Sequence, residues 1–150
     1  MIVVENEMAM KRLGETIGKL LHGGEVIQLV GDVGAGKTTF VKGLAVGLSI
    51  DEAIQSPTFT ISRIYTAHND LRLAHYDFYR LGTAGIMADE LSEVVRDDAT
   101  VTVIEWADIV DDVLPKDTLT ITILATSVDE RQVTLAAGGA ASKRLAEAIV

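Results

Sequence analysis

Apolar residues recur at every third or fourth position in several segments of the chain, which is the period of a helix with one buried face. Asn6 is a suitable N-cap for the first such segment, and Gly23 and Gly24 follow its end. Gly43 and Gly47 weaken the second helix but allow close packing against a neighbour. The predicted helices cover residues 6–21, 38–48, 86–96 and 141–149.

Runs rich in β-branched and other apolar residues lie between these helices and predict the strands of a sheet. Short polar joins at residues 67–70 and 127–130 predict two antiparallel hairpins. The predicted strands cover residues 2–4, 26–30, 59–65, 71–78, 101–104, 119–123 and 131–136. Because the early elements alternate and the later ones pair as hairpins, we predict a three-layer α/β fold with a mixed parallel and antiparallel central sheet.

Residues 31–38 fit the pattern G-x-x-x-x-G-K-[ST], the phosphate-binding loop, and they lie between a predicted strand and a predicted helix. Its glycines allow backbone N–H groups to point at phosphate oxygens. Lys37 is expected to reach the β- and γ-phosphates, Thr38 to ligate Mg²⁺, and Thr39 to lie near the α-phosphate. The alternative, a glycine-rich turn that only links two elements, leaves the lysine and the hydroxyl unexplained. The expected nucleotide-binding positions are Asp32, Val33, Gly34, Ala35, Gly36, Lys37, Thr38 and Thr39.

Two acidic residues are candidates for the carboxylate that such a site needs. Glu105 ends the apolar run 101–104, which is the usual place for this group, although a glutamate that merely ends a strand is the alternative. Asp77 ends the run 71–76 and is the rival candidate. The chain contains no Asn-Lys-x-Asp sequence of the kind that selects guanine, so ATP is the expected nucleotide.

Length, charge and composition limit the number of domains, the partners and the location expected for the protein. The 150 residues have the length of one domain, so we expect residues 1–150 to form a single P-loop NTPase-like domain. The net charge of −9 argues against a broad RNA-binding face, and any nucleic acid is expected to be held by another protein. The absence of cysteine excludes disulfides and thiolate metal sites. With no signal peptide and no apolar run of about 20 residues, a cytoplasmic protein without a membrane span is expected.

Four separated segments together resemble the TsaE family, formerly YjeE, the small bacterial ATPases of tRNA threonylcarbamoyladenosine (t6A) synthesis. The resemblance extends from the first helix to about residue 115, and Val33 replaces the usual leucine. The four segments are the phosphate loop 31–39, Ser56-Pro57-Thr58-Phe59-Thr60, His75-Tyr76-Asp77-Phe78-Tyr79-Arg80-Leu81 and Val103-Ile104-Glu105-Trp106.

The resemblance implies roles for several further residues. It places Thr58 in a switch-like loop near the γ-phosphate, makes Asp77 a catalytic or water-positioning carboxylate, and gives Glu105 a part in Mg²⁺ binding. Trp106 would adjoin the nucleotide site, and Glu7 would lie near the base or ribose. The implied partners are TsaB and TsaD, with tRNA reached only through them. In this family TsaD transfers the threonylcarbamoyl group to adenosine 37, and ATP hydrolysis by TsaE supports repeated turnover.

Other interpretations of these residues remain open. Thr58 could begin a strand, Trp106 could be a core anchor, and Glu7 could be a favourable charge in the first helical turn. His75 is expected to be packed or hydrogen-bonded rather than a ligand. Arg80 could pair with Asp77 or Glu90, which we prefer to an arginine-finger role. For the whole protein, a P-loop small-molecule kinase or a nucleotide-dependent binding module are the alternatives to an ATPase.

Overall fold

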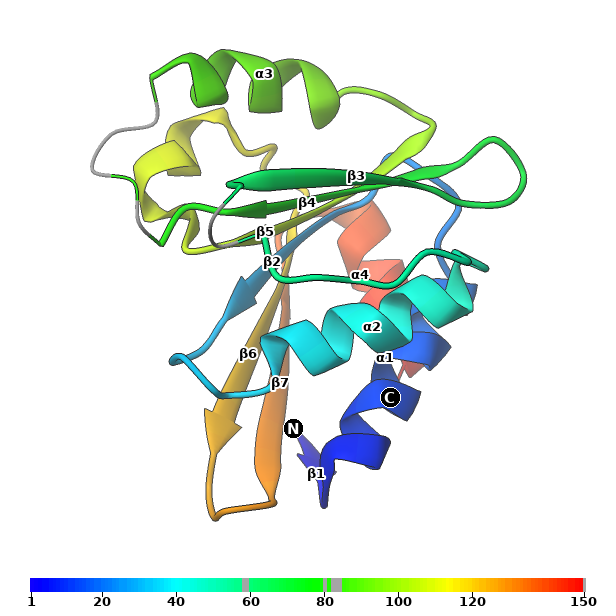
Figure 1. Ribbon diagram of the computed structural model, residues 1–150, viewed down its shortest axis with the longest axis vertical. Coiled ribbons are helices and arrows are strands. Elements are labelled where there is room, and N and C mark those ends of the chain that lie inside the picture. The colour runs from blue at the N-terminus through cyan, green and yellow to red at the C-terminus, as the bar shows by residue number, and fades with distance from the viewer. Residues whose placement is uncertain (58–59, 80, 82–84, 150) are drawn as a thin grey trace.

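The computed structural model describes residues 1–57, 60–79, 81 and 85–149. Seven strands form one sheet in the order β1-β7-β6-β2-β5-β4-β3 (Figure 1). The strands are β1 (Ile2–Val4), β2 (Val26–Val30), β3 (Ser62–Thr66), β4 (Arg72–Asp77), β5 (Thr100–Glu105), β6 (Leu119–Ala125) and β7 (Arg131–Ala137). The helices are α1 (Glu7–Lys19), α2 (Lys37–Gly47), α3 (Ile86–Val94), α4 (Ala140–Ile149) and the 3-10 helix η1 (Ala107–Val113).

The sheet is mixed, as predicted. Strands β4, β5, β2 and β6 are parallel neighbours, whereas β3 joins β4, and β7 joins both β6 and β1, in antiparallel pairs. The two predicted hairpins are therefore confirmed as β3–β4 and β6–β7. The phosphate-loop strand β2 lies between β5 and β6, in the middle of the parallel part.

Helices cover the sheet on both faces, which confirms the three-layer prediction. In Figure 1, α3 and η1 lie above the sheet, and α1, α2 and α4 lie below it. The central strand β5 supplies both cores: Val101 and Val103 pack toward α1 and α2, whereas Ile104 packs toward α3 and η1. Because both faces of this strand are covered, all six of its residues are buried, the two threonines included.

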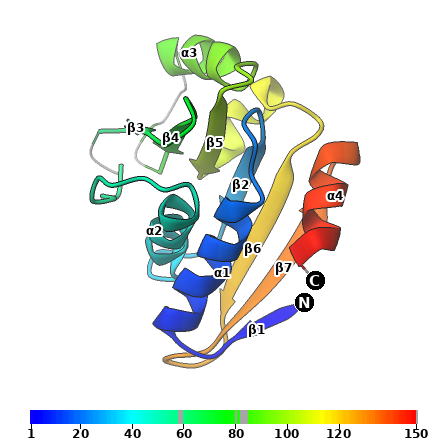
Figure 2. The ribbon, with the colours of Figure 1, turned by 90° about the vertical axis from the view of Figure 1, so that its right-hand side faces the viewer.

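Helices α1 and α2 lie so close together that their contact requires glycine (Figure 2). A Cβ atom on Gly43 would lie 2.0 Å from the Lys11 carbonyl oxygen, and one on Gly14 would lie 2.3 Å from the Phe40 carbonyl oxygen. Gly47 makes an equally close approach to α1. The close packing predicted for this helix is thus confirmed. It places the start of α1 beside the phosphate loop at the start of α2.

The Asn6 cap is confirmed, because its Oδ1 accepts the Ala9 N–H at 2.9 Å. Strand β3 begins at Ser62 rather than at residue 59, and the N–H groups of Thr60 and Ile61 both donate to the Pro57 carbonyl oxygen instead of to a strand. Helix η1 was not predicted, since seven residues in 3-10 geometry carry no helical period.

Among the helices of the described residues, none is long and apolar enough to cross a membrane.

Candidate nucleotide-binding site

The phosphate loop joins β2 to α2 in the conformation that its glycines allow. Gly34 and Gly36 have φ values of 84° and 110°, in the left-handed region that glycine adopts without strain. Gly31 lies outside that region, so its role differs from the predicted conformational one. A Cβ atom there would lie 2.8 Å from the Ile123 carbonyl oxygen, and the loop needs this glycine for space.

Lys37, the first residue of α2, is folded back over the loop. It is only 6% exposed, and its Nζ donates a hydrogen bond of 2.6 Å to the Gly31 carbonyl oxygen. The same Nζ lies 3.7 Å from Glu105 Oε1 and 4.2 Å from the centre of the Trp106 ring. An ammonium group has three donors, so the bond to Gly31 leaves two for other oxygens.

Asp77 and Glu105 stand side by side at the carboxyl ends of parallel strands. They are register partners in the β4–β5 pair and are 4% and 3% exposed. Asp77 Oδ1 accepts the Tyr79 N–H at 2.9 Å, whereas Glu105 Oε2 lies 2.6 Å from His75 Nε2. Both candidates for the required carboxylate therefore occupy the same edge of the sheet. The expectation that His75 is hydrogen-bonded is confirmed.

A cavity of about 360 Å³, here called the loop cavity, brings most of the predicted residues together. Its walls combine the phosphate loop and the start of α2 with the ends of β4 and β5. Thr58 and Arg80 lie outside the described residues, but Ser56, from the same segment as Thr58, reaches this wall. The lining residues are Val33, Gly34, Gly36, Lys37, Thr38, Thr39, Ser56, Asp77, Tyr79, Glu105 and Trp106.

The oxygen atoms around the loop cavity suit magnesium. Thr38, Asp77 and Glu105 supply a hydroxyl and two carboxylates, which are the hard ligands that Mg²⁺ prefers. The described part of the chain contains no group of three or more His, Cys, Asp or Glu side chains placed to hold a metal by themselves. That arrangement fits an ion shared between one or two protein ligands, phosphate oxygens and water.

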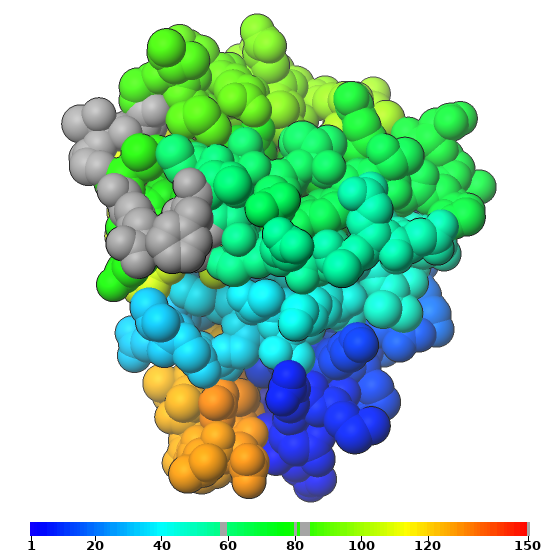
Figure 3. Space-filling view, in the orientation of Figure 1, coloured from blue at the N-terminus to red at the C-terminus, as the bar shows by residue number. Residues whose placement is uncertain are grey.

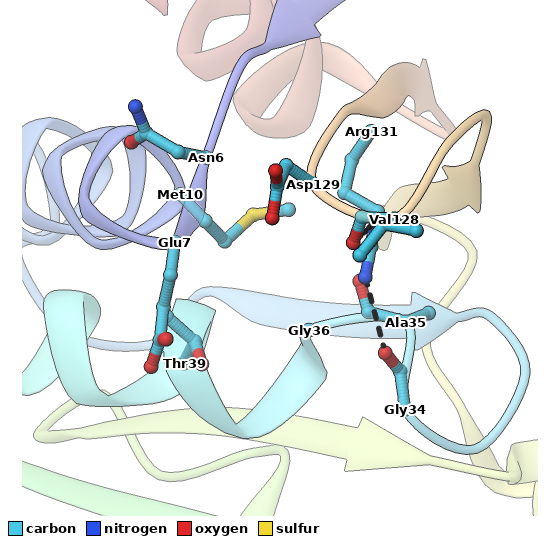
Figure 4. A pocket seen from close by; sticks show the side chains of 10 residues that line it. All are labelled: Asn6, Glu7, Met10, Gly34, Ala35, Gly36, Thr39, Val128, Asp129 and Arg131. Carbon is cyan, nitrogen blue, oxygen red and sulfur yellow. Dashed lines mark hydrogen bonds between the residues drawn. The ribbon is translucent and has the colours of Figure 1, made fainter.

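A second cavity of about 270 Å³, the helix-end cavity, lies next to the first (Figure 4). It is bounded by the start of α1, the phosphate loop and the β6–β7 turn, and it shares Gly34, Gly36 and Thr39 with the loop cavity. Glu7 and Met10 line it from α1. In Figure 3 the orange β6–β7 hairpin and the blue N-terminal segment lie below the cyan segment that carries the loop.

The remaining loop residues differ in position. Val33 is 72% exposed and lines the loop cavity, whereas Asp32 is exposed and is not among the residues that line either cavity. The Asp32 carbonyl oxygen instead accepts the Ala35 N–H at 3.0 Å, which closes the loop. Asp32 was predicted to bind nucleotide, and the structure gives it a contact within the loop backbone.

Trp106 lies directly after Glu105 and lines the loop cavity. Its φ of 55° places a bulky residue in the left-handed region, which marks a constrained backbone. Its ring lies 4.8 Å from the Tyr79 ring, and it also packs against the core beneath α3 and η1. The two interpretations of Trp106 therefore overlap, because it anchors part of a core and lines the cavity.

Arg131 is a residue of this site that the sequence did not identify. Its Nε donates to the Ala35 carbonyl oxygen at 2.9 Å, and its Nη2 lies 3.5 Å from the Gly34 carbonyl oxygen (Figure 4). In a trans peptide the C=O and the following N–H point in opposite directions. Holding the Ala35 carbonyl therefore turns the Gly36 N–H toward the opposite side of the loop. Since 96 residues separate Arg131 from Ala35, no local pattern could predict this contact.

Comparisons with known proteins agree with one another. A family model described as "Threonylcarbamoyl adenosine biosynthesis protein TsaE" matches residues 4–133. A protein of Treponema pallidum named tRNA threonylcarbamoyladenosine biosynthesis protein TsaE is 42% identical over 125 residues, covering 83% of this chain and 91% of that protein. The Bacillus subtilis protein of the same name is 38% identical over 148 residues, covering 95% and 88%. The crystal structure of Bacillus subtilis YdiB superposes with a TM-score of 0.82 at 34% identity, covering 99% of this chain and 91% of that one.

Proposed function

We propose, from the premise that this chain belongs to the TsaE family, that it binds and hydrolyses ATP and thereby supports t6A formation at position 37 of tRNA. One observation carries the proposal: the loop cavity places the phosphate-loop lysine and hydroxyl within one space with two buried carboxylates. A glycine-rich turn that only linked β2 to α2 would not need this convergence.

We assign each residue of the loop cavity the role that its chemistry suits. Backbone N–H groups of the loop and the start of α2 would bind phosphate oxygens, with Lys37 adding a positive charge beside them. Thr38 and Glu105 would hold Mg²⁺, which when bound neutralises phosphate charge. Asp77, which lines the loop cavity at the end of the neighbouring strand, is the candidate for orienting the attacking water. The helix-end cavity, with Glu7 at its wall, is where we place the base or ribose.

The proposed partners are TsaB and TsaD, acting in the cytoplasm. The net charge of −9 gives the chain little to attract an RNA backbone, so the protein is expected to reach tRNA only through them. A site completed by a partner in trans can accelerate phosphoryl transfer by about 10³–10⁵-fold. Hydrolysis by the lone chain is therefore expected to be slow.

The test measures ATP turnover by the purified protein with and without its cognate TsaB–TsaD complex. We expect slow turnover alone, a clear rise with the complex, and loss of both in Lys37→Ala, whose fold is checked by circular dichroism. Lys42→Ala is the matched control, because Lys42 is an exposed lysine on the same helix. Fast turnover that the complex does not change, or near-normal turnover by the folded Lys37→Ala variant, would contradict the proposal. Transfer of phosphate to a small acceptor would favour a kinase.

A further inference from the structure

His75 is a fully buried polar side chain in the interior of strand β4. Its register partner on β5 is Val103, two residues before Glu105. Because strand side chains alternate between faces with a period of two, His75 and Glu105 point to the same face of the sheet. Their side chains meet there, with 2.6 Å between His75 Nε2 and Glu105 Oε2.

Because of this contact, the two oxygen atoms of Glu105 have different neighbours. Oε2 is directed at His75, and Oε1 lies 3.7 Å from Lys37 Nζ, on the side of the phosphate loop. The terminal torsion of a glutamate is broad and poorly restrained by its own chain. A hydrogen bond to one oxygen therefore decides where the other one points. A carboxylate that binds Mg²⁺ is ionised and can only accept, so in the proposed site the Nε2 atom of His75 is the donor.

A histidine is a costly residue for this position if packing is its only role. Within the described residues, His75 Nδ1 is buried and has no hydrogen-bond partner. A buried polar atom without a partner destabilises the fold, and an apolar side chain of similar volume would avoid that cost. The bond to Glu105 is what the imidazole provides and an apolar side chain cannot.

We propose that His75 is a positioning residue that fixes the Glu105 carboxylate in the orientation needed for Mg²⁺–nucleotide binding. The inference rests on the proposed function, because Glu105 is assigned to the metal there. Groups that orient a metal ligand typically contribute about 10–100-fold in metal affinity or activity. Removal of the His75 donor should therefore weaken nucleotide binding with Mg²⁺ and spare binding in a chelator.

The binding test compares His75→Leu with His75→Gln by calorimetric titration of ADP, with Mg²⁺ or with a chelator. We expect His75→Leu to weaken Mg²⁺-dependent binding by about 10–100-fold and to leave metal-free binding unchanged. Glutamine carries an N–H donor near the position of Nε2, so His75→Gln should recover much of the loss. In a Glu105→Ala background, His75→Leu should cause little further loss, because both changes act through one carboxylate.

Tyr76→Phe is the matched control. Tyr76 follows His75 on β4, is equally buried, and donates a hydrogen bond of 3.0 Å to Glu90 on the other face of the strand. The variant thus loses a hydrogen bond from the same strand, away from the loop cavity. It should bind nucleotide as the unchanged protein does, with and without Mg²⁺. If Tyr76→Phe reproduces the His75→Leu pattern, strand stability explains the effect and the proposal is wrong.

A second measurement does not depend on nucleotide or on a folded His75 variant. Nitrogen-15 NMR of the histidine ring in the protein without added nucleotide should show a protonated Nε2 and a bare Nδ1 at His75. Glu105→Gln should shift the Nε2 resonance. A bare Nε2, or a resonance that ignores Glu105, would overturn the proposal even if ATP binds normally. Conversely, if no nucleotide binds but the NMR pattern holds, the proposed function fails while the contact stands.

Equal losses with Mg²⁺ and with the chelator in His75→Leu would show that His75 supports the fold in general. Unchanged binding in both conditions would show that it is only a packing residue. Either result would overturn the positioning role.

Discussion

Asp77 and Glu105 are adjacent carboxylates that line the loop cavity, and different roles are proposed for them. Glu105 contacts His75 and Lys37, and Asp77 Oδ1 accepts the backbone N–H of Tyr79. These contacts place the Glu105 carboxylate beside an ammonium group and an imidazole, which suits the Mg²⁺ role proposed for it. Asp77 lines the loop cavity at the end of the neighbouring strand, which suits the water-orienting role proposed for it.

Asp77→Ala should therefore lower kcat by about 10²–10⁴-fold, the usual contribution of a general base or water-orienting group, with a much smaller effect on ATP binding. Asp77→Asn should behave similarly in turnover, while its amide oxygen still accepts the Tyr79 N–H. Single-turnover hydrolysis and equilibrium titration of ATP separate the two effects. Were binding and turnover to fall together, Asp77 would be a structural or metal-shell residue.

At the scale of elements, the phosphate loop is supported from two directions. Its glycine-lined helix α2 packs directly on α1, and Arg131 ties the loop carbonyls to the β6–β7 hairpin. The same guanidinium also bonds the carbonyl oxygens of Ser127, Val128 and Glu130 within that hairpin turn. The loop is thus braced by segments that lie before and far after it in the sequence.

Arg131→Leu should weaken ATP binding both with and without Mg²⁺, because it loosens the backbone that faces the phosphates. Hydrogen bonds from a charged donor contribute about 1.5–3 kcal/mol, so a tenfold or greater loss of affinity is expected. Arg144→Leu is the control, since it removes the same charge from an exposed position on α4. Calorimetric titration of ATP, with and without Mg²⁺, measures the affinity of each variant. Equal affinities for the two variants would mean that the contact does not order the loop.

Gly43→Ala should destabilise the fold although alanine is the better helix former. The propensity gain is about 1 kcal/mol, whereas overpacking a contact at 2.0 Å typically costs about 1–3 kcal/mol or more. Urea unfolding should show a net loss, and Val46→Ala, on the exposed side of α2, should change little. A Gly43→Ala protein as stable as the original would show that the helices separate without cost.

Sequence patterns predicted those features of the fold that depend on residues close together in the chain. The Asn6 cap, the strands with apolar runs and the glycine-rich loop each depend on neighbours within a few residues, and the structure has them. Helix η1 carries no helical period, so periodicity could not predict it. The contacts of Arg131 and the His75–Glu105 bond join residues far apart in the chain. Only the sheet order brings such pairs together.

At the scale of the whole molecule, three groups with shifted pKa values make stability depend on pH. Bonds from the Ala99 N–H, the Thr100 hydroxyl and the Arg72 guanidinium lower the pKa of Asp97. Bonds from the Ser142 hydroxyl and N–H lower the pKa of Asp117, which caps α4. Burial, followed by the bond to Glu90, raises the pKa of Tyr76.

These shifts predict loss of stability at both ends of the pH scale. A lowered carboxyl pKa contributes stability above the unfolded value of about 4, and this is lost as the pH falls through the folded value. A raised tyrosine pKa contributes stability below about 10, and this is lost as the pH rises further. Urea unfolding across pH measures both. Asp97→Asn should reduce the loss of stability at acid pH, and Tyr76→Phe should reduce the loss at alkaline pH. If the two variants and the unchanged protein show parallel stability profiles across pH, Asp97 and Tyr76 are not the groups responsible.

The chain contains one tryptophan, and that indole lies 4.2 Å from the ammonium group of the phosphate-loop lysine. All tryptophan emission of the protein therefore originates beside Lys37, with the Tyr79 ring on a neighbouring side. A cation at that distance shifts the energy of the excited indole, so displacement of the lysine changes the colour and the intensity of the light. The protein carries its own optical probe at the point where phosphate would arrive, and no second tryptophan dilutes the signal.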